Sequence, residues 1–219
     1  MIHSFTEENY LKAIYKLSES YPTVATSLLA DELNIRAATV TDMLKKLAAK
    51  NLIKYKKYKG VSLTNEGRKI SIKIIRKHRL WELFLVEKMS FKWDEVHEIA
   101  EQLEHIQSDA LIDRLDELLG HPSHDPHGDP IPDKKGVINI QKSNPLSEIK
   151  NPGNYTVVGV VENNDDFLRY LNRIGVAIGS KLSVQSIEEY DGSFKLSINR
   201  TDPIFMSNDV AKNLLVVNY

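Results

Sequence analysis

The pattern that most restricts the fold of this chain lies within residues 26–63, where two helical segments are separated by a tight turn and followed by a hairpin. The first segment ends in LLADELN, and Asn34 is suited to the left-handed stop that the turn requires. The second, IRAATVTDMLKKLAAKNLI, carries one apolar stripe, and IKYKKYKGVSLT then alternates around Gly60. The stripe consists of Val40, Met43, Leu44 and Leu47.

A third helix is predicted ahead of this pair, over residues 5–20, where apolar residues recur at helical spacing and Thr6 is placed to cap the start. Three helices and a basic hairpin predict a winged helix. The second helix of its helix-turn-helix pair, which carries TVTDMLKKL, enters the major groove, while the hairpin reaches the DNA backbone. A protein-docking module with a solvated basic face is the alternative. The candidate DNA contacts are Arg36, Thr39, Thr41, Asp42 and Lys45 on the helix, and Lys56 and Lys57 on the hairpin.

The charge distribution supports a polyanionic partner for the first part of the chain. Residues 1–80 carry a net charge of +9 and the remainder −10, although the two halves could instead pair with each other. The chain contains no cysteine, so a metal ion would have to be bound by nitrogen and oxygen. With no apolar run of membrane-spanning length and no signal-peptide pattern, a cytoplasmic protein without membrane contact is expected.

Two long helices are predicted after the hairpin, over residues 65–89 and about 93–119, both with apolar stripes. Long apolar helices between two modules suggest a dimer interface, and a two-fold dimer reads the two half-sites of palindromic operator DNA. The predicted domains are a winged helix at 1–72, a helical metal-binding and dimerisation domain at 73–135, a linker at 136–150 and a small domain at 151–219.

The second of these helices carries HEIAEQLEH, in which His97, Glu101, Glu104 and His105 would share one face. The two histidines are about 12 Å apart along such a helix and cannot bind one ion together. The helix geometry therefore predicts two metal sites, one at Glu101, Glu104 and His105 and another at His78, Glu82 and His97. Plain solvent-facing polar residues are an equally good interpretation of the spacing alone.

Catalytic motifs are absent from the sequence. HEIAE lacks the second histidine of H-E-x-x-H metalloproteases, and no nucleophile elbow, P-loop or dinucleotide-binding glycine pattern occurs. A binding protein rather than an enzyme is predicted. The alternatives are a metal-independent winged-helix regulator and a metal-binding enzyme or buffer.

Taken together, TEENYLKAIYKL, TVTDMLKKL, YKGVSLTNEGR, RKHRLWE, VHEIAEQLEHIQSD and HGDPIP resemble the diphtheria-toxin-repressor family of metal-dependent bacterial regulators across residues 1–132. The resemblance implies a homodimeric repressor with Mn(II) or Fe(II) as cofactor, two ions per subunit. It implies a primary site at Asn9, Glu101, Glu104 and His105, and an ancillary site at His78, Glu82 and His97.

Two departures from the family pattern concern the first helix. Asn9 stands where iron-sensing members have methionine and manganese-sensing members aspartate, so the primary site is less negative. Lys12 replaces a glutamate of the manganese-sensing members, which rules out their paired-ion arrangement.

Residues after the linker read as short strands with a helix at DDFLRYLNRIG. This module resembles the five-stranded SH3-like, FeoA-like barrel of the longer family members, and the resemblance offers Glu162, or less directly Asp165 or Asp166, as a further ancillary ligand. A surface carboxylate beside a turn is the alternative for each. The predicted fold class is mainly α with small β: a winged helix-turn-helix, a helical dimerisation domain and a C-terminal barrel.

Overall fold

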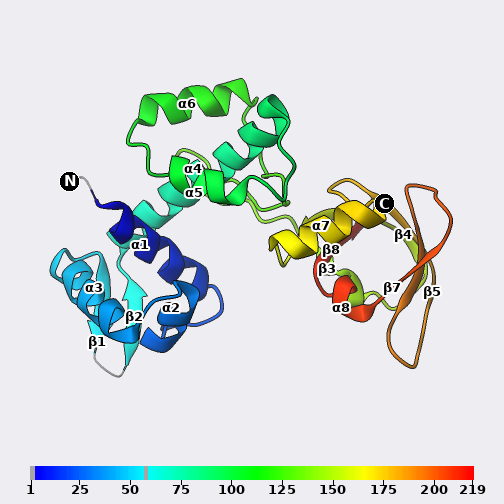
Figure 1. The fold of residues 1–219 in the computed structure, drawn as a ribbon, viewed down its shortest axis with the longest axis horizontal. Helices are drawn as coiled ribbons and strands as arrows, with labels where there is room; N and C mark the ends of the chain where they lie inside the picture. Colours follow the sequence, from blue (N-terminus) through cyan, green and yellow to red (C-terminus); the bar gives the residue numbers. More distant parts are fainter. Residues whose placement is uncertain (1–2, 57–58) are drawn as a thin grey trace. The chain divides into compact units, whose positions relative to one another are not determined.

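The computed structural model describes residues 3–56 and 59–219, and Figure 1 shows their helices and strands. The chain divides into two compact units. The N-terminal unit comprises residues 1–78, 101–109 and 132–137, and the C-terminal unit comprises residues 79–100, 110–131 and 138–219. The predicted domain boundary at residue 72 falls inside one continuous helix, α4 (Asn65–Met89).

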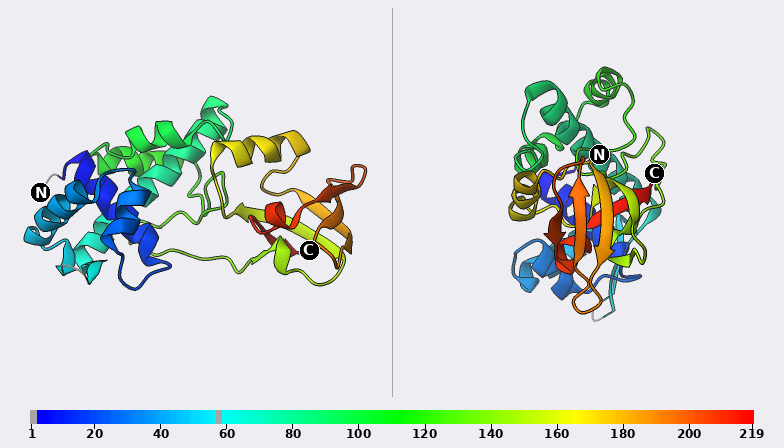
Figure 2. Two further views of the ribbon diagram at one scale, coloured as in Figure 1. Left: turned by 60° about the horizontal axis from the view of Figure 1, so that its bottom comes forward. Right: turned by 90° about the vertical axis from the view of Figure 1, so that its right-hand side faces the viewer.

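The N-terminal unit contains the predicted winged helix. Asn34 has a φ of 52°, as expected for the left-handed stop between the second and third helices. The antiparallel hairpin pairs Ile53 with Leu63 and Lys56 with Gly60, whereas Lys57 lies outside the described residues. Figure 2 shows the helices of this unit from two further sides. Its elements are α1 (Phe5–Ser18), α2 (Thr26–Glu32), α3 (Ala37–Ala49), β1 (Ile53–Lys56) and β2 (Gly60–Leu63).

Gly60 begins the second strand of the hairpin because no side chain fits there. Its φ is 85°, and an added Cβ would lie 2.5 Å from the Val24 carbonyl oxygen. Val24 and Val61 exchange two backbone hydrogen bonds of 2.9 Å, which attach the hairpin to the segment before α2. The close backbone approach thus fixes the hairpin against the helices.

The prediction that Thr6 caps α1 is wrong, because the helix begins earlier. Ser4 is the N-cap: its hydroxyl accepts from the Glu7 backbone N–H, and the Glu7 carboxylate accepts from the Ser4 backbone N–H at 3.1 Å. Glu7 also accepts a hydrogen bond of 2.6 Å from Lys50 Nζ, at the C-terminal cap of α3. One carboxylate therefore caps α1 and joins it to the end of α3.

The single helix predicted over residues 93–119 is also wrong. The structure has two helices, α5 (His97–Leu103) and α6 (Asp109–Leu118). The apolar periodicity of the sequence continues across the break. Glu104 and His105, however, lie outside both helices and contact α1. Ser108, a residue type favoured at helix starts, is the sequence signal that marks the second beginning.

A six-stranded sheet in the order β3-β8-β4-β5-β6-β7 forms most of the C-terminal unit, one strand more than predicted. The sheet already begins at Asn144, and Leu146 is fully buried in its core, so it overlaps the linker predicted over residues 136–150. No helix in the described ranges is long and apolar enough to cross a membrane. The elements are β3 (Asn144–Pro145), the 3-10 helix η1 (Leu146–Glu148), β4 (Gly153–Val160), α7 (Asp165–Ile174), β5 (Lys181–Ile187), β6 (Phe194–Ile198), β7 (Ile204–Met206), α8 (Asn208–Ala211) and β8 (Leu214–Asn218).

Replacing Glu7 with Gln is expected to lower the free energy of unfolding of the N-terminal unit by about 1–2 kcal/mol at pH 7, since the Lys50 pair loses its charge. Burial raises the pKa of Glu7, but Lys50 and the Ser4 backbone N–H lower it by more, so the net shift is downward. A depressed folded-state pKa contributes stability that is present above pH 4.5, the unfolded value, and is lost as the pH falls through the folded value. Denaturant titrations of both proteins should therefore differ at pH 7 and converge in acid. An equal difference at all pH values would contradict the role of the charge.

Candidate metal centre

A fully buried carboxylate, that of Glu104, lies at the centre of the contacts between α1 and the segment after α5. Glu104 is 0% exposed. Lys12 Nζ, from α1, donates to Glu104 Oε1 at 2.7 Å and Oε2 at 2.8 Å, and it also bonds to Glu101 Oε1. His78 Nδ1 is 2.7 Å from Glu104 Oε2. Because a buried charge needs compensation, these contacts keep α1 docked on this segment.

His105 is held by a second carboxylate of α1, that of Glu8. His105 Nδ1 is 2.7 Å from Glu8 Oε2, and Gln107 Nε2 donates to Glu8 Oε1 at 2.7 Å. The Phe5 ring stacks on the imidazole with centroids 4.6 Å apart. His105 Nε2 lies 3.9 Å from Oε1 of Glu104. A carboxylate on one imidazole nitrogen orients the other as a ligand, which is how metal-binding histidines are commonly supported.

Asn9, which lies between Glu8 and Lys12 in α1, offers an unused hydrogen-bond acceptor. Its Oδ1 is buried and has no hydrogen-bond partner among the described residues. Buried polar atoms are normally satisfied, so an orphaned carbonyl oxygen next to Glu8 in α1 is chemically suited to a cation. The predicted primary set of Asn9, Glu101, Glu104 and His105 is therefore supplied by two segments of one unit.

A buried cation, Lys77, adds to the electrostatics of this region. Its Nζ lies 3.5 Å from the Ile106 carbonyl oxygen. Burial lowers the pKa of Lys77, and the charges of Glu8 and Glu104 oppose that shift. Positive charge therefore faces the carboxylates from α4 as well as from α1.

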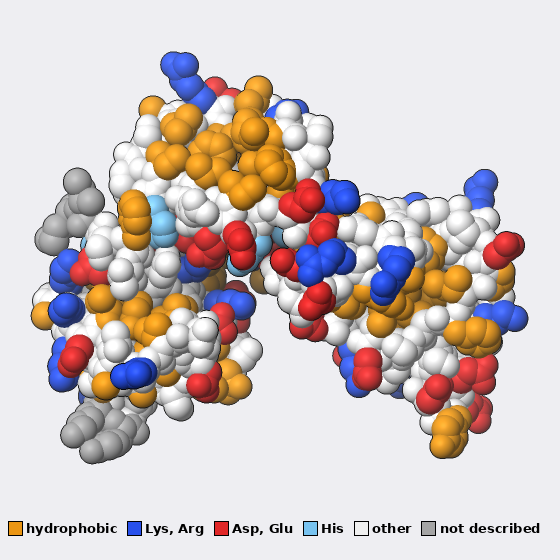
Figure 3. Space-filling model, in the orientation of Figure 1, with side chains coloured by type: hydrophobic (Ala, Val, Ile, Leu, Met, Phe, Trp, Pro, Cys, Tyr) orange, Lys and Arg blue, Asp and Glu red, His pale blue; other side chains and the backbone are white. Residues whose placement is uncertain are grey.

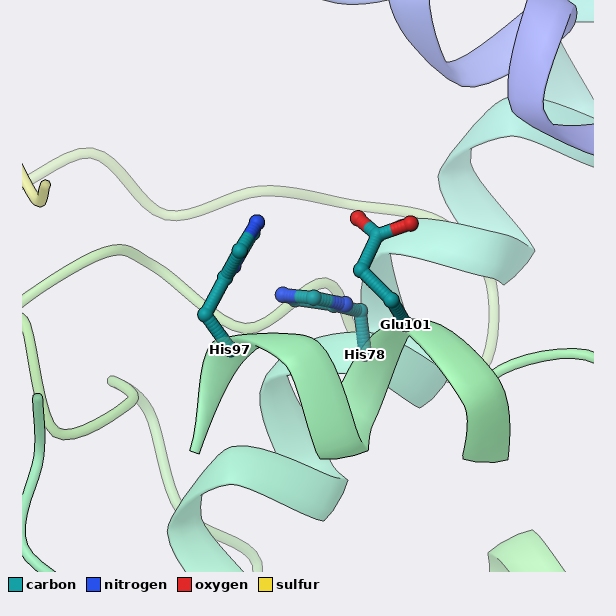
Figure 4. A group of neighbouring side chains, drawn as sticks. All are labelled: His78, His97 and Glu101. Atoms are coloured by element: carbon teal, nitrogen blue, oxygen red, sulfur yellow. The ribbon is translucent and has the colours of Figure 1, made fainter. Parts of the chain in front are cut away.

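Figure 4 shows His78 on α4 beside Glu101 on α5, both in the N-terminal unit. His97 begins α5, four residues before Glu101, so these two side chains lie on the same face of the helix, as predicted. The structure places Glu104 and His105 just beyond the helix end. Lys12 bonds to both Glu101 and Glu104, whereas His105 contacts Glu8.

A second cluster lies in the C-terminal unit, around Glu82 on α4. Glu82, Asp125 and His127 are all buried, and one ligand atom from each lies within 4.8 Å of the others. His97 Nδ1 is 3.4 Å from Glu82 Oε1, so two of the predicted ancillary residues are in contact. Arg79 contributes a cation, with its Nε 3.7 Å from Asp125 Oδ2.

His127 has one ring nitrogen committed and one available. Its Nε2 is 2.9 Å from the Trp93 carbonyl oxygen, whereas Nδ1 is buried, without a hydrogen-bond partner in the described structure, and 3.7 Å from Glu82 Oε2. Burial lowers the pKa of His127, but Glu82, Asp125 and the Trp93 carbonyl outweigh it and raise the pKa to about 9. Burial, together with Glu82 and Asp129, raises the pKa of Asp125 to about 7. The two carboxylates thus favour the protonated form of His127.

The acidic candidates on the barrel lie in surface positions. Glu162 is exposed, and its carboxylate accepts a hydrogen bond from Asn164 Nδ2. Asp165 and Asp166, in the first turn of α7, both pair with Arg169, the latter at 2.8 Å. These contacts are those of a solvated helix start.

The candidate DNA contacts are on the surface of the winged helix. Arg36, the N-cap of α3, is exposed, as are Thr39, Asp42 and Lys45 on the helix, whereas Thr41 is half-buried. Lys56 on β1 is exposed. The Thr41 hydroxyl donates to the Ala37 carbonyl, and Lys45 pairs with Asp42 at 3.0 Å, both within α3.

Sequence reasoning missed Glu8, Asp125 and His127. Glu8 directly precedes Asn9 in α1, but nothing in the local sequence indicates its contact with His105. HGDPIP contributes only to the family resemblance, although DPHGD places Asp125 and His127 two residues apart at a glycine turn.

Three family models match the chain in succession. The N-terminal DNA binding domain of the iron dependent repressor matches residues 4–61, its metal binding and dimerisation domain residues 64–133, and the FeoA domain residues 144–218. A solved manganese-dependent transcriptional repressor in complex with manganese is 34% identical, with a TM-score of 0.84, over 97% of this chain and 100% of that one. The chain belongs to the iron-dependent repressor family.

Other relatives fit this assignment. Iron-dependent repressor IdeR of Mycobacterium tuberculosis (strain ATCC 25618 / H37Rv) is 35% identical over 127 residues, which are 58% of this chain and 55% of that protein. The match thus spans about half the length of this curated iron-dependent repressor. The diphtheria toxin repressor of Corynebacterium diphtheriae is 28% identical over 96% of each chain. The structure of ScaR with bound Zn²⁺ is 33% identical with a TM-score of 0.75, over 97% of this chain and 99% of that one.

Exchanging Glu8 for Gln is expected to weaken Mn(II) binding at the primary centre about 10–100-fold, the usual cost of losing a carboxylate behind a metal-binding histidine. Isothermal titration calorimetry would measure the change, with the exposed Asp31→Asn on α2 as the charge-matched control. Unchanged Mn(II) affinity in the Glu8 variant would show that Glu8 serves only the folding of α1.

Proposed function

We propose that this family member is a metal-dependent transcriptional repressor that binds palindromic operator DNA as a homodimer and catalyses no reaction. The observation that carries the proposal is the orphaned, buried Oδ1 of Asn9 in α1, beside Glu8 and Lys12, which reach residues 101–105. The winged helix itself therefore supplies a donor to the metal centre.

The donor chemistry suits Mn(II) or Fe(II). Asn9, Glu101, Glu104 and His105 would hold one ion, and Glu82, His97, Asp125 and His127 a second, while the predicted ancillary ligand His78 is in contact with Glu104. Both sets consist of oxygen and imidazole nitrogen without sulfur, the ligand type that Mn(II) accepts. Among the solved relatives one is a complex with manganese, and ScaR has been solved with Zn²⁺ and with Cd²⁺. Tight Zn(II) binding would agree with the Irving–Williams order and would not identify the activating metal.

When bound, the metal supplies a positive charge that several donors share. The donors of the primary site come from α1, from α5 and from the segment after α5. The ion would therefore favour the arrangement in which α1 is docked against that segment. A bound ion and a bound operator that prefer the same arrangement strengthen each other by linkage.

The dimer interface is proposed for the apolar surface over α6. Leu111 and Leu118, on this helix, are 40% and 60% exposed. Figure 3 shows hydrophobic side chains gathered over this part of the C-terminal unit. A contiguous apolar patch of this kind is typical of a protein interface. Two winged helices related by a two-fold axis would read two half-sites.

Removing the metal is expected to abolish high-affinity operator binding in a gel shift, and Mn(II) or Fe(II) is expected to restore it. Glu101→Ala should remove the metal response while the dimer stays folded, and Asn9→Asp should strengthen the response by adding a negative charge to the site. Asn9→Ala is the matched control for the position. If both Asn9 variants respond to metal as the parent does, α1 contributes no ligand. Operator binding that is indifferent to chelator would instead identify a metal-independent regulator.

Replacing Lys56 with Ala is expected to weaken binding to operator and random DNA alike and to reduce the slope of log K against log salt by about one, because the hairpin contacts phosphates. Lys212→Ala, an exposed lysine just after α8 in the barrel, is the control with the same change in net charge. Fluorescence anisotropy at four salt concentrations would provide both slopes. Equal slopes for the parent and the Lys56 variant would place the hairpin away from the DNA backbone.

A further inference from the structure

We propose that Lys12 supplies a positive charge to the primary metal site of Asn9, Glu101, Glu104 and His105. Its ammonium group links α1 to residues 101–104 when no ion is bound, and it competes with an incoming metal ion for the same carboxylates. The inference rests on the proposed function for the identity of the ion that arrives. The link made by the lysine rests only on contacts within the N-terminal unit.

The ammonium group of Lys12 is bonded to the carboxylate oxygens that a metal ion would need as ligands. Its Nζ lies 2.7 Å and 2.8 Å from the two oxygens of Glu104 and is also bonded to Glu101 Oε1. Both carboxylates belong to the proposed ligand set. A cation coordinated by them has to compete with the lysine for the same oxygens, and it is also repelled by the lysine charge at short range.

The burial of the partner distinguishes this contact from an ordinary surface ion pair. Lys16, one turn further along α1, pairs with Glu32 at 3.1 Å, with side chains 70% and 31% exposed. Exposed pairs of that kind contribute little to stability. The Glu104 side chain is 0% exposed and that of Lys12 only 20%, so removing the lysine leaves a buried negative charge with less compensation.

The position of Lys12 on α1 makes this ion pair a structural link. Glu8, Asn9 and Lys12 lie within one helical turn, and two of them already bond to the segment that follows α5. Lys12 and Glu8 therefore dock α1 against the ligand segment. A bound metal ion would replace the lysine at Glu101 and Glu104 with a cation of higher charge, so it would strengthen this docking.

The test compares Lys12→Met with Lys16→Met, a matched change on the same helix, and with Lys12→Arg, which keeps the charge. In the metal-free full chain, Lys12→Met is expected to lower the melting temperature of the N-terminal unit by about 6 °C or more, the scale of a broken buried ion pair. Lys16→Met should leave it within about 2 °C, and Lys12→Arg should retain most of the parent value.

The same variants are titrated with Mn(II) alone by calorimetry, following the binding phase that Glu101→Ala abolishes. Lys12→Met is expected to strengthen this phase by at least about tenfold, since a neighbouring positive charge is gone, and Lys12→Arg should not strengthen it. Parent-like Mn(II) affinity in Lys12→Met would overturn the competition between lysine and metal.

A double-mutant cycle keeps the proposal testable if Lys12→Met is strongly destabilised. Adding Glu101→Gln to Lys12→Met removes one of the uncompensated carboxylates and should recover part of the lost melting temperature, although Glu101→Gln alone lowers it. Strictly additive effects would overturn the link. A parent chain with no Mn(II) phase at all would contradict the proposed function, while the metal-free melting data would still decide the role of Lys12.

Discussion

The buried carboxylate of Glu104 is the constraint on which the N-terminal unit depends. A fully buried negative charge is tolerated only with close compensation, and Lys12 and His78 provide it from α1 and α4. The charge therefore holds together three segments that are far apart in the sequence. Helix α5, which carries Glu101, ends at Leu103. Glu104 and His105 contact α1 from the segment between α5 and α6.

In the C-terminal unit, the loop that carries Asp125 and His127 is also fixed by its backbone. The His127 carbonyl oxygen accepts a hydrogen bond of 3.0 Å from the Val160 N–H of β4. Gly128, with a φ of 89°, lies so close to the same strand that an added Cβ would be 2.1 Å from the Val158 carbonyl oxygen. The His127 ring also stacks on Trp93, which is packed into the core of the barrel. Barrel packing and the position of the second cluster are thus determined by the same residues.

Most of the fold was predictable because it depends on local pattern. The helix-turn-helix, the left-handed turn at Asn34, the hairpin around Gly60 and the helix of residues 65–89 all follow from periodicity and turn chemistry. Predictions failed where a tertiary contact overrides the pattern. Ser4 and not Thr6 caps α1, because Glu7 completes a capping box with Ser4. The helix predicted over residues 93–119 ends at Leu103, and Glu104 and His105 contact α1 from the segment that follows.

The candidate sites were predictable to different degrees for the same reason. Residues 101, 104 and 105 are close in sequence, so any compact arrangement keeps them near one another, even though the assumed continuous helix is wrong. Glu8 and His127 act through partners that are about 97 and 45 residues away in the chain, respectively His105 and Glu82, and no spacing rule reveals such pairs. Asn9 was assigned from family resemblance alone; the structure adds that its side-chain oxygen is buried and lacks a hydrogen-bond partner within the described residues.

The two clusters solve one electrostatic problem in different ways. Carboxylates gathered for a divalent ion repel one another when the ion is absent, and a stable metal-free fold needs positive charge or protons among them. The first cluster contains a permanent cation, Lys12, from the winged helix. The second combines a permanent cation, Arg79, with His127, whose pKa is raised to about 9, and Asp125, whose pKa is raised to about 7. In the proposed function, an ion bound at either cluster would exchange with this positive charge. Of the two proposed ligand sets only the first includes a residue of α1, so it is the one that would couple metal binding to the winged helix.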